Sequence, residues 1–344
     1  MAKPTVSVCM VTYNHERYIA QAVESVLMQK TEHPYEIVIG EDCSTDQTRE
    51  IVSGLANRHP DRIKLRLSRR NKGAKKNFVG TFGDCVGKYV VILEGDDYWI
   101  SPNKLQLQVD ALNARPDWAI CFHPAVCLYE DGASGPAYLP EEWKKSEAKL
   151  TDLFVSNFIP TSGAMFRNRL CWPLPDWFLE STLGDWPLHI LNAAHGKIGF
   201  LPEPMSVYRI HSQGIWSGQN LATKLTSIFN MLTAVDHHFE GQYRQEIDAN
   251  RINTVQWLAS ELHKTRTIPK DSDVWESVYI QMLDDADHLR AHLEEVTQSI
   301  PYRVLREILR PWMQLAAVIR RLRGLPDPAP KQLAGPPTPL IRAA

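Results

Sequence analysis

The sequence lacks the features that define several large protein classes. No apolar run approaches the length of about 18 residues that a membrane-spanning helix needs. The opening segment MAKPTVSVCMVTYN enters a strand-like run at once and lacks the charged and then apolar pattern of a signal peptide. The six cysteines are scattered, with no CxxC pair and no zinc-type spacing, so we expect reduced and mostly packed thiols.

Charge and glycine patterns exclude further classes. The formal net charge of −2 gives no overall attraction to nucleic acid. No GxGxxG motif follows the first strand-like run, as a dinucleotide-dependent oxidoreductase would require. The 344 residues, 44% hydrophobic and 23% charged, are typical of a globular protein with one large domain and an appendage, or with two domains. We therefore expect a cytoplasmic protein that binds no nucleic acid.

The N-terminal part alternates between strand-like and helix-like patterns. Short apolar runs at residues 5–11, 35–39 and 89–93 predict buried strands, and apolar residues at helical spacing follow the first two runs. Each of the three runs is followed by polar residues. This alternation favours a largely parallel α/β sheet, and such a sheet binds its ligands at the carboxyl ends of its strands.

The pattern changes near residue 220. Beyond Leu221 strand patterns disappear and helical periodicity dominates. We expect an N-terminal α/β domain over residues 1–220 and a helical region over 221–324 that serves acceptor, oligomer or membrane association. The tail over 325–344, rich in Pro, Gly and Ala, is expected to be disordered.

Two acidic pairs follow predicted strands. Asp96 and Asp97 close the run VVILEGDD, and adjacent carboxylates repel each other unless a cation or hydrogen-bond donors stabilise them. A solvated turn is the plain alternative, but the position directly after a buried strand favours a Mg²⁺ or Mn²⁺ site completed by substrate phosphates. Glu41 and Asp42 close EIVIGED and are either an acidic helix N-terminus or a group that binds a base or a ribose.

Four segments, in this order and spacing, resemble the family 2 glycosyltransferases, which have the GT-A fold. The segments are VSVCMVTYNHERYIAQAVESVLMQ, EIVIGEDCSTDQT, NKGAKKNF and GKYVVILEGDDYW. The resemblance covers about the first 130 residues well and extends more loosely to about residue 215. It implies a mixed, mainly parallel sheet flanked by helices and a metal-dependent, inverting sugar transfer from a nucleoside-diphosphate donor.

The resemblance also implies a nucleotide-binding role for several residues. Thr12 and Tyr13 match positions that hold the base. Glu41 and Asp42 match an acidic pair that reaches the base and the ribose. Lys76 matches a basic residue, often arginine, that lies near the nucleotide.

The acidic turn, residues 94–97 (Glu-Gly-Asp-Asp), departs from the family pattern at one position. Asp97 matches a ligand of the metal, Mn²⁺ or Mg²⁺, and Asp96 matches a residue that binds the ribose or metal-bound water. Glu94 stands where the family commonly has aspartate, and this difference leaves the role of Glu94 open.

Later residues complete the implied site. Asp185 in LGDWPLH resembles the catalytic base, and a helix-capping aspartate is the alternative. His211 in YRIH resembles a histidine that ligates the metal or contacts the diphosphate, and a merely packed residue is the alternative. Arg209 either pairs with phosphate or is a structural cation at a strand end. Residues 161–163 (Thr-Ser-Gly) resemble an acceptor-side loop, which a plain turn explains almost as well.

The implied reaction moves a sugar, by default from a UDP donor, to a hydroxyl of a glycan or lipid-linked acceptor in polysaccharide or glycoconjugate biosynthesis. Two alternatives stay open. One is a nucleotide-sugar-binding module without catalysis, against which the presence of both metal carboxylates and the candidate base argues. The other is a sugar nucleotidyltransferase, which usually has a Gly-rich loop where this chain has TYNHERY.

Residues 302–323 carry apolar side chains at helical spacing among six arginines. This pattern is typical of an interfacial helix on an anionic membrane, which would place the protein peripherally on the inner face of the cell membrane. A helix packed on a neighbour or a homo-oligomer contact explains it nearly as well, and Pro311 interrupts the run.

Overall fold

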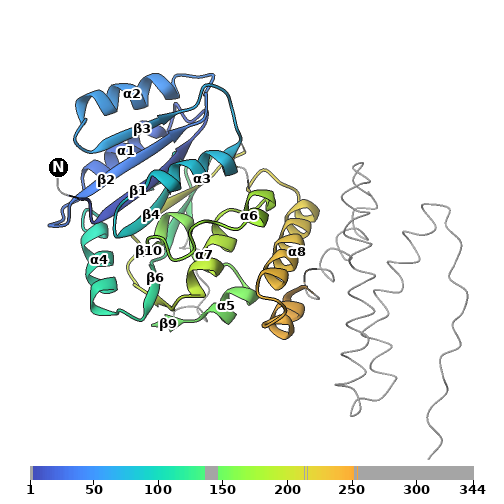
Figure 1. The fold of residues 1–344 in the computed structure, drawn as a ribbon. Helices are drawn as coiled ribbons and strands as arrows, with labels where there is room; N and C mark the ends of the chain where they lie inside the picture. Colours follow the sequence, from blue (N-terminus) through green and yellow to red (C-terminus); the bar gives the residue numbers. More distant parts are fainter. Residues whose placement is uncertain (1–2, 136–145, 213, 215, 252–253, 255–344) are drawn as a thin grey trace, which may run out of the picture. The chain divides into compact units, whose positions relative to one another are not determined.

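The structure is a computed structural model that describes residues 3–135, 146–212, 214, 216–251 and 254 (Figure 1). These residues belong to one compact unit, Met1–Val255. The expected disordered tail, the arginine-rich segment 302–323 and the rest of the second unit, Gln256–Ala344, lie outside the described residues. No helix in the described part of the chain is long and apolar enough to cross a membrane.

Strands and helices alternate through the first part of the unit, as expected. The strands are β1 (Val6–Thr12), β2 (Tyr35–Glu41), β3 (Ile63–Leu67), β4 (Tyr89–Glu94), β5 (Tyr98–Trp99), β6 (Trp118–Phe122), β7 (Ala125–Tyr129), β8 (Ser134–Gly135), β9 (Glu147–Ala148), β10 (Met165–Arg167), β11 (Lys197–Phe200) and β12 (Ser206–Ile210). The helices are α1 (Ile19–Leu27), α2 (Thr48–Arg58), α3 (Ala74–Asp84), α4 (Lys104–Ala114), α5 (Leu150–Val155), the 3₁₀ helix η2 (Thr161–Gly163), α6 (Asp176–Glu180), α7 (Asp185–Ala193) and α8 (Leu221–His238).

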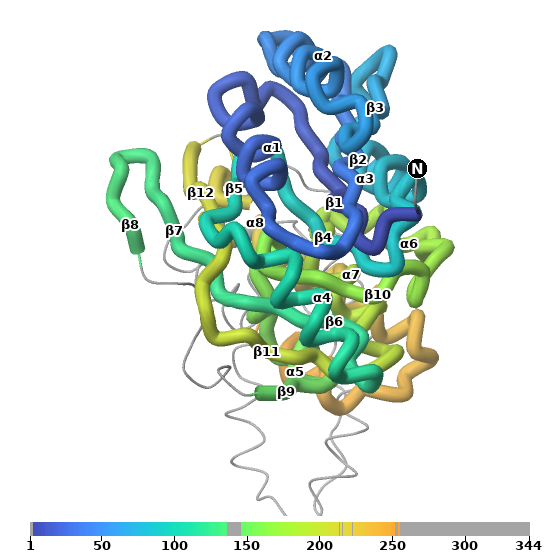
Figure 2. The backbone as a smooth tube through the Cα atoms, turned by 90° about the vertical axis from the view of Figure 1, so that its left-hand side faces the viewer, coloured from blue at the N-terminus to red at the C-terminus, as the bar shows by residue number. Residues whose placement is uncertain are grey.

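The main sheet has eight strands in the order β3-β2-β1-β4-β10-β6-β11-β9. Strands β3, β2, β1 and β4 are parallel, and β10 is antiparallel to both of its neighbours. A smaller sheet of order β5-β12-β7-β8 lies at one side of the unit (Figure 2). The expected mixed, mainly parallel sheet flanked by helices is confirmed.

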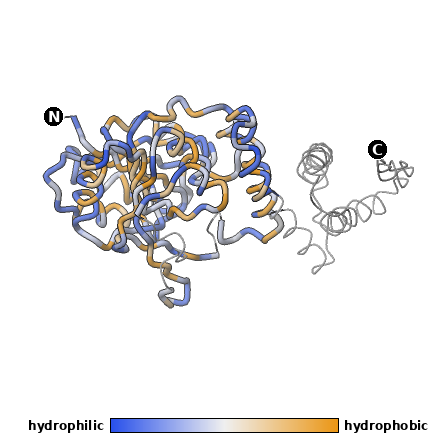
Figure 3. The backbone as a smooth tube through the Cα atoms, turned by 90° about the horizontal axis from the view of Figure 1, so that it is seen from below, coloured by the Kyte–Doolittle hydropathy of each residue, from blue (hydrophilic) through white to orange (hydrophobic). Residues whose placement is uncertain are grey.

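Both faces of the main sheet are covered, which explains why its central strands are apolar throughout. Alternate residues of β4 contribute to two separate hydrophobic clusters: Val90 and Ile92 to one, and Val91 and Leu93 to the other. Hydrophobic residues accordingly lie largely in the interior of the unit, whereas many outer turns are hydrophilic (Figure 3). The six cysteines form no disulfide, and four of them are buried.

The helical pattern expected from Leu221 begins there as α8, and the side chain of Asn220 accepts a hydrogen bond from the Thr223 amide at 2.8 Å. Leu232 and Val235 of α8 are fully buried in the same cluster as Val90. This helix therefore packs into the core of the unit that contains the sheet.

A buried lysine supports the segments beside the carboxyl end of β4. Lys104 is 0% exposed, donates a hydrogen bond to Gln108, and lies 4.6 Å from the centre of the Trp99 indole. Gln108 donates from Nε2 to the Gly163 carbonyl at 2.8 Å. Lys104 and Gln108 thus connect Trp99 of β5 to Gly163 of η2. Both segments flank the site described below.

Lys104 makes stability depend on pH. Burial lowers the pKa of Lys104 from 10.5 to about 7, so between these values the unfolded chain binds a proton that the folded chain does not, and stability rises with pH. Lys104→Met is expected to remove up to about 1.4 kcal/mol per pH unit from this rise. Urea unfolding at several pH values above 7 measures the slope, with exposed Lys30→Met as the control. An unchanged slope in Lys104→Met would contradict the assignment.

Candidate active site

The register of the sheet brings three polar loops together. Thr12 at the end of β1 pairs with Glu41 at the end of β2, and Val11 pairs with Glu94 at the end of β4. The segments that follow these strands therefore start side by side at one edge of the sheet. This is the edge at which parallel α/β sheets bind their ligands.

The first two loops are held together by reciprocal hydrogen bonds. The Asn14 amide donates to Ser44 Oγ at 3.0 Å, and the Glu16 amide donates to Asp46 Oδ2 at 3.0 Å. In return, the Gln47 amide donates to Glu16 Oε2 at 3.0 Å. Each loop supplies a carboxylate that binds backbone of the other, so the segment that carries the predicted base-binding residues is ordered.

The predicted nucleotide-binding residues differ in accessibility. Thr12 is buried, and its Oγ1 lies 3.3 Å from His15 Nδ1. Tyr13 is 40% exposed, and Lys76 is exposed in the first turn of α3. The side chains of Tyr13 and Lys76 are thus accessible to a ligand, whereas the side chain of Thr12 is almost inaccessible.

The two acidic residues after β2 bind groups of the protein itself. Glu41 is 0% exposed, pairs with the Arg49 guanidinium and accepts from the Ser44 amide at 2.5 Å. Asp42 accepts from the amides of Lys72 at 2.9 Å and Gly73 at 2.8 Å. Glu41 thereby fixes the start of α2 and Asp42 the turn before α3. Their contact with a base or a ribose stays a prediction, and for Glu41 it would require rearrangement.

Asp97 is a buried carboxylate with only half of its hydrogen-bonding capacity used. It is 1% exposed, and its Oδ1 accepts from the Arg209 amide at 2.9 Å. No hydrogen bond reaches its buried Oδ2 within the described ranges. Burial and the charges of Asp96 and Glu94 raise the pKa of Asp97 well above its ordinary value. The amide and the charge of Arg209 oppose this rise only in part, so a further cation would stabilise a charged Asp97.

Asp96 lies between two imidazoles. Its Oδ2 is 3.1 Å from His211 Nε2 and 3.9 Å from His15 Nε2. Burial would raise the pKa of Asp96, but the hydrogen bond from His211 and the charge of His15 outweigh burial and lower it. The same hydrogen bond raises the pKa of His211. The structure therefore places His211 beside the acidic turn, and its contact with a metal or a diphosphate stays a prediction.

Arg209 is occupied by partners in the protein. Its guanidinium donates to the Asp96 carbonyl and to Gln21, and it lies 4.9 Å from the ring centre of Tyr18 and 4.5 Å from that of Tyr98. Together with the amide that binds Asp97, these contacts join β12 to the acidic turn. Of the two alternatives for Arg209, the contacts favour the structural cation.

Asp185 is the first residue of α7, and it does not cap that helix. The N-cap position is Gly184, and no side-chain cap hydrogen bond is present there. Instead Asp185 Oδ2 accepts from Asn157 Nδ2 at 2.9 Å and from Thr161 Oγ1 at 3.2 Å. The capping interpretation therefore does not describe what this carboxylate binds.

Glu94 and Tyr208 show that the carboxylates share one site. Burial and then the charges of Asp96 and Asp185 raise the pKa of Glu94 to about 8. Burial also raises the pKa of Tyr208 on β12, and Glu94, Asp97, Asp96 and Asp185 add to that rise. Asp185 is thus within electrostatic reach of the groups that follow β4.

Lys75 is a site residue that the sequence did not single out. Its ammonium donates to the Leu183 carbonyl and lies 4.4 Å from the ring centre of Phe178. Burial lowers its pKa to about 8, against the opposing effect of Asp185. The motif NKGAKKNF offers two adjacent lysines, and only the turn of α3 decides that Lys75 is the one directed toward the Asp185 loop.

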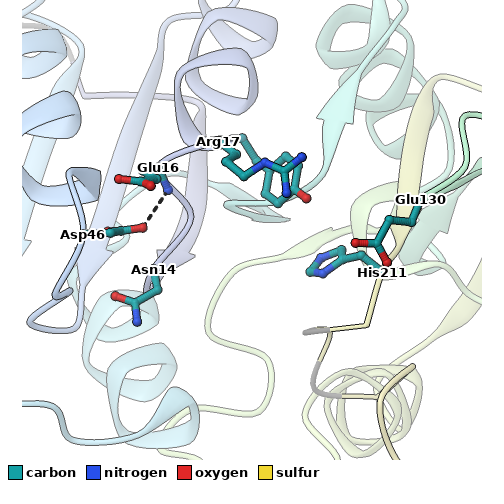
Figure 4. Close-up of a pocket in the computed structure, with 7 residues that line it drawn as sticks. Asn14, Glu16, Arg17, Asp46, Glu130 and His211 are labelled. Atoms are coloured by element: carbon teal, nitrogen blue, oxygen red, sulfur yellow. Dashed lines mark hydrogen bonds between the residues drawn. The ribbon is translucent and has the colours of Figure 1, made fainter.

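A pocket of about 270 Å³ opens beside His211 (Figure 4). Its lining comes from the loop after β1, from the loop before α2 and from the ends of β7 and β12. The lining residues are Asn14, Glu16, Arg17, Tyr18, Asp46, Glu130 and His211. The pocket therefore adjoins the acidic turn on the side of the first loop.

The residues around the acidic turn fit a divalent cation only in part. No cluster of three or more His, Cys, Asp and Glu side chains among the described residues is arranged to hold a metal ion. The unpartnered buried oxygen of Asp97 and the nearby His211 are nevertheless hard or borderline donors of the required kind. Mg²⁺ and Mn²⁺ sites in nucleotide enzymes often have one or two protein ligands and take the rest from phosphates. The donor set fits a site of that kind.

Comparisons with known proteins show the family and the fold that the chain resembles. Residues 7–174 match the family described as Glycosyl transferase family 2. The uncharacterized protein Rv1520 of Mycobacterium tuberculosis is 37% identical over 211 residues, which are 61% of this chain and about 60% of that protein. Residues 7–174 thus form a domain similar to glycosyl transferase family 2, and the chain spans about 60% of the length of this relative.

Two solved structures show the same fold. S. aureus TarS 1-349 in complex with UDP-GlcNAc has a TM-score of 0.63 at 17% identity and matches 93% of this chain and 92% of its own. The mannosyltransferase PcManGT from Pyrobaculum calidifontis, in complex with GDP-Man and Mn²⁺, has a TM-score of 0.52 at 17% identity and matches 94% and 88%. The fold of this chain is the GT-A fold.

Proposed function

We propose that the protein is an inverting glycosyltransferase that moves a sugar from a nucleoside-diphosphate donor to an acceptor hydroxyl. The observation that carries the proposal is the buried Asp97 carboxylate, whose Oδ2 has no partner among the described residues, at the carboxyl end of β4 and within the family 2 domain. A second carboxylate, Asp185, acts electrostatically on the same cluster.

The donor is proposed to be a UDP-sugar. Support comes from the TarS complex with UDP-GlcNAc, whereas the PcManGT complex with GDP-Man keeps guanosine donors as a rival. Tyr13 and Lys76 are exposed at the edge where the base would lie, and Asp96 is proposed to bind the ribose. The acceptor is proposed to be a glycan or a lipid-linked glycan of a polysaccharide or glycoconjugate pathway.

Asp97 and His211 are the residues proposed to hold Mn²⁺ or Mg²⁺. When bound, the ion would neutralise the charge that develops on the departing diphosphate. Asp96 and the Arg209 amide keep Asp97 and His211 in place, because Asp96 binds His211 at 3.1 Å and the Arg209 amide binds Asp97 at 2.9 Å. The support from a neighbour is the Mn²⁺ in the PcManGT structure.

Asp185 is proposed to accept the proton of the acceptor hydroxyl during a single displacement. Its Oδ2 is bound by Asn157 and Thr161, and no hydrogen bond among the described residues reaches Oδ1. A carboxylate oxygen without a hydrogen-bond donor is the group that a general base requires. No covalent intermediate is needed, so no nucleophile has to be found among the cysteines.

A thermal-shift panel tests donor class and metal dependence together. UDP, GDP and TDP, each with and without Mn²⁺, are added to the full chain, and unfolding is followed by fluorescence. We expect UDP with Mn²⁺ to raise the melting temperature and UDP alone to raise it little, because a ligand stabilises only the state that it binds. Equal shifts with all three nucleotides, or shifts indifferent to Mn²⁺, would contradict the proposal.

A further inference from the structure

We propose that Asn157 and Thr161 are positioning residues that hold Asp185 in the orientation in which one of its oxygens faces the acceptor. This inference rests on the proposed function, since it explains how the carboxylate of the proposed base, Asp185, is oriented. Both side chains donate to one atom, Asp185 Oδ2, at 2.9 Å and 3.2 Å. Two donors on a single oxygen fix the carboxylate plane and leave Oδ1 as the available acceptor.

The two donors are themselves rigidly placed. Thr161 opens η2, whose next residue, Ser162, lies with its Oγ 3.0 Å from Ser206 Oγ on β12. Gly163, the last residue of η2, binds Gln108 through its carbonyl at 2.8 Å. A Cβ on Gly163 would lie 2.4 Å from the His123 carbonyl, so η2 is packed directly against this backbone.

Asn157 is held from the core side. The residues that follow it, Phe158 and Ile159, are 1% and 2% exposed and lie in the main hydrophobic cluster. Because these neighbours cannot move without opening the core, the amide of Asn157 stays directed at Asp185.

The opposite side of the Asp185 loop is fixed as well. Lys75 of α3 donates to the Leu183 carbonyl, and Ser181 Oγ accepts from the Leu183 amide at 3.2 Å. The charged and titratable groups that act on Asp185 or are acted on by it are Lys75 from α3, Glu94 from β4, His189 from α7 and Tyr208 from β12. Asp185 thus follows a segment that Lys75 fixes at Leu183, and its carboxylate is bound by the two neutral donors Asn157 and Thr161.

Neutral donors suit a base better than a cation would. Hydrogen bonds from an amide and a hydroxyl stabilise the ionised carboxylate and set its direction without cancelling its charge. Removing them should leave Asp185 free to rotate, so that turnover falls while donor binding is kept. A loss in kcat without a change in the donor KM is a result that a purely structural role would not cause.

The test uses a matched pair at Thr161. Thr161→Val keeps the shape and removes the hydroxyl, and Thr161→Ser keeps the hydroxyl. With UDP-GlcNAc and Mn²⁺ as the probe, release of UDP by transfer or by hydrolysis is followed from pH 5 to pH 9. We expect Thr161→Val and Asn157→Ala each to lower kcat about tenfold or more, since each loses a hydrogen bond to a charged group. The donor KM should change by less than about twofold, and Thr161→Ser should restore the profile.

The outcomes separate this inference from the function on which it rests. Loss of turnover in Asp185→Asn together with a wild-type pH profile and kcat in Thr161→Val and Asn157→Ala would overturn the positioning role alone. Full turnover in Asp185→Asn would overturn the assignment of the base. Equal melting temperatures of the variants and the wild type would show that lost turnover does not come from unfolding. A lower kcat that Thr161→Ser does not restore would also overturn the inference.

Discussion

The Asp185→Asn variant is expected to bind the donor nucleotide as the wild type does and to lose sugar transfer by about 10²- to 10⁴-fold, the usual contribution of general-base catalysis. Asparagine keeps the size of the side chain and an oxygen that can accept from Asn157 and Thr161, so the loop should stay in place. Only the capacity to take a proton is lost. Steady-state release of the nucleoside diphosphate measures the effect.

A matched control exists on another helix. Asp176 is the first residue of α6, as Asp185 is of α7, but it is exposed to solvent. Asp176→Asn makes the same chemical change at a comparable helix position and should leave turnover unchanged. Wild-type turnover in Asp185→Asn, or equal losses in both variants, would remove Asp185 as the base.

The second large effect is expected from Asp97→Ala, which should abolish the stabilisation that a nucleotide gives in the presence of Mn²⁺. At a nucleotide concentration one hundred times its Kd, the wild type should gain about 2.7 kcal/mol. This gain corresponds to a rise of several degrees in Tm for a domain of this size, at about 2–4 °C per kcal/mol. The variant should show no Mn²⁺-dependent part of that rise.

The control for this variant is Asp61→Ala, which removes an exposed carboxylate far along the chain from the acidic turn. It should respond to nucleotide and Mn²⁺ as the wild type does. A full Mn²⁺-dependent shift in Asp97→Ala would show that the cation binds elsewhere.

The sequence predicts the part of the fold that depends on local pattern. Continuous apolar runs at β1, β2 and β4 are found where both faces of the sheet are covered, and the acidic residues after β4 are found at the carboxyl ends of the parallel strands. Periodicity could not predict that β10 enters the sheet antiparallel between β4 and β6, because this pairing joins distant residues such as Val91 and Met165.

Part of the site could likewise not be predicted from the sequence. The contacts of Asp185 with Asn157 and Thr161 and of Lys75 with Leu183 join residues 28, 24 and 108 positions apart. Asn157 stands in no distinctive motif, and the segment at residues 161–163 resembles an acceptor-side loop without indicating what Thr161 binds. Only the tertiary structure shows that Asn157 and Thr161 converge on one oxygen.

Burial also changes the interpretation of residues that the sequence did single out. Glu41 resembles a ligand-binding carboxylate, and in the structure it is fully buried against Arg49. The sequence left two roles open for Arg209, and in the structure its guanidinium lies against Tyr18 and Tyr98. Spacing along the chain indicates which residues reach the site edge, but not which of them keep a free polar group there.

The proposed sugar transfer requires a cation held by the acidic turn against the donor's diphosphate. Crystals grown with UDP and Mn²⁺ and measured at the manganese absorption edge would locate that ion directly. We predict an anomalous peak within bonding distance of Asp97 Oδ2 and of a diphosphate oxygen. A peak at another place, or UDP bound with no peak beside Asp97, would contradict the account.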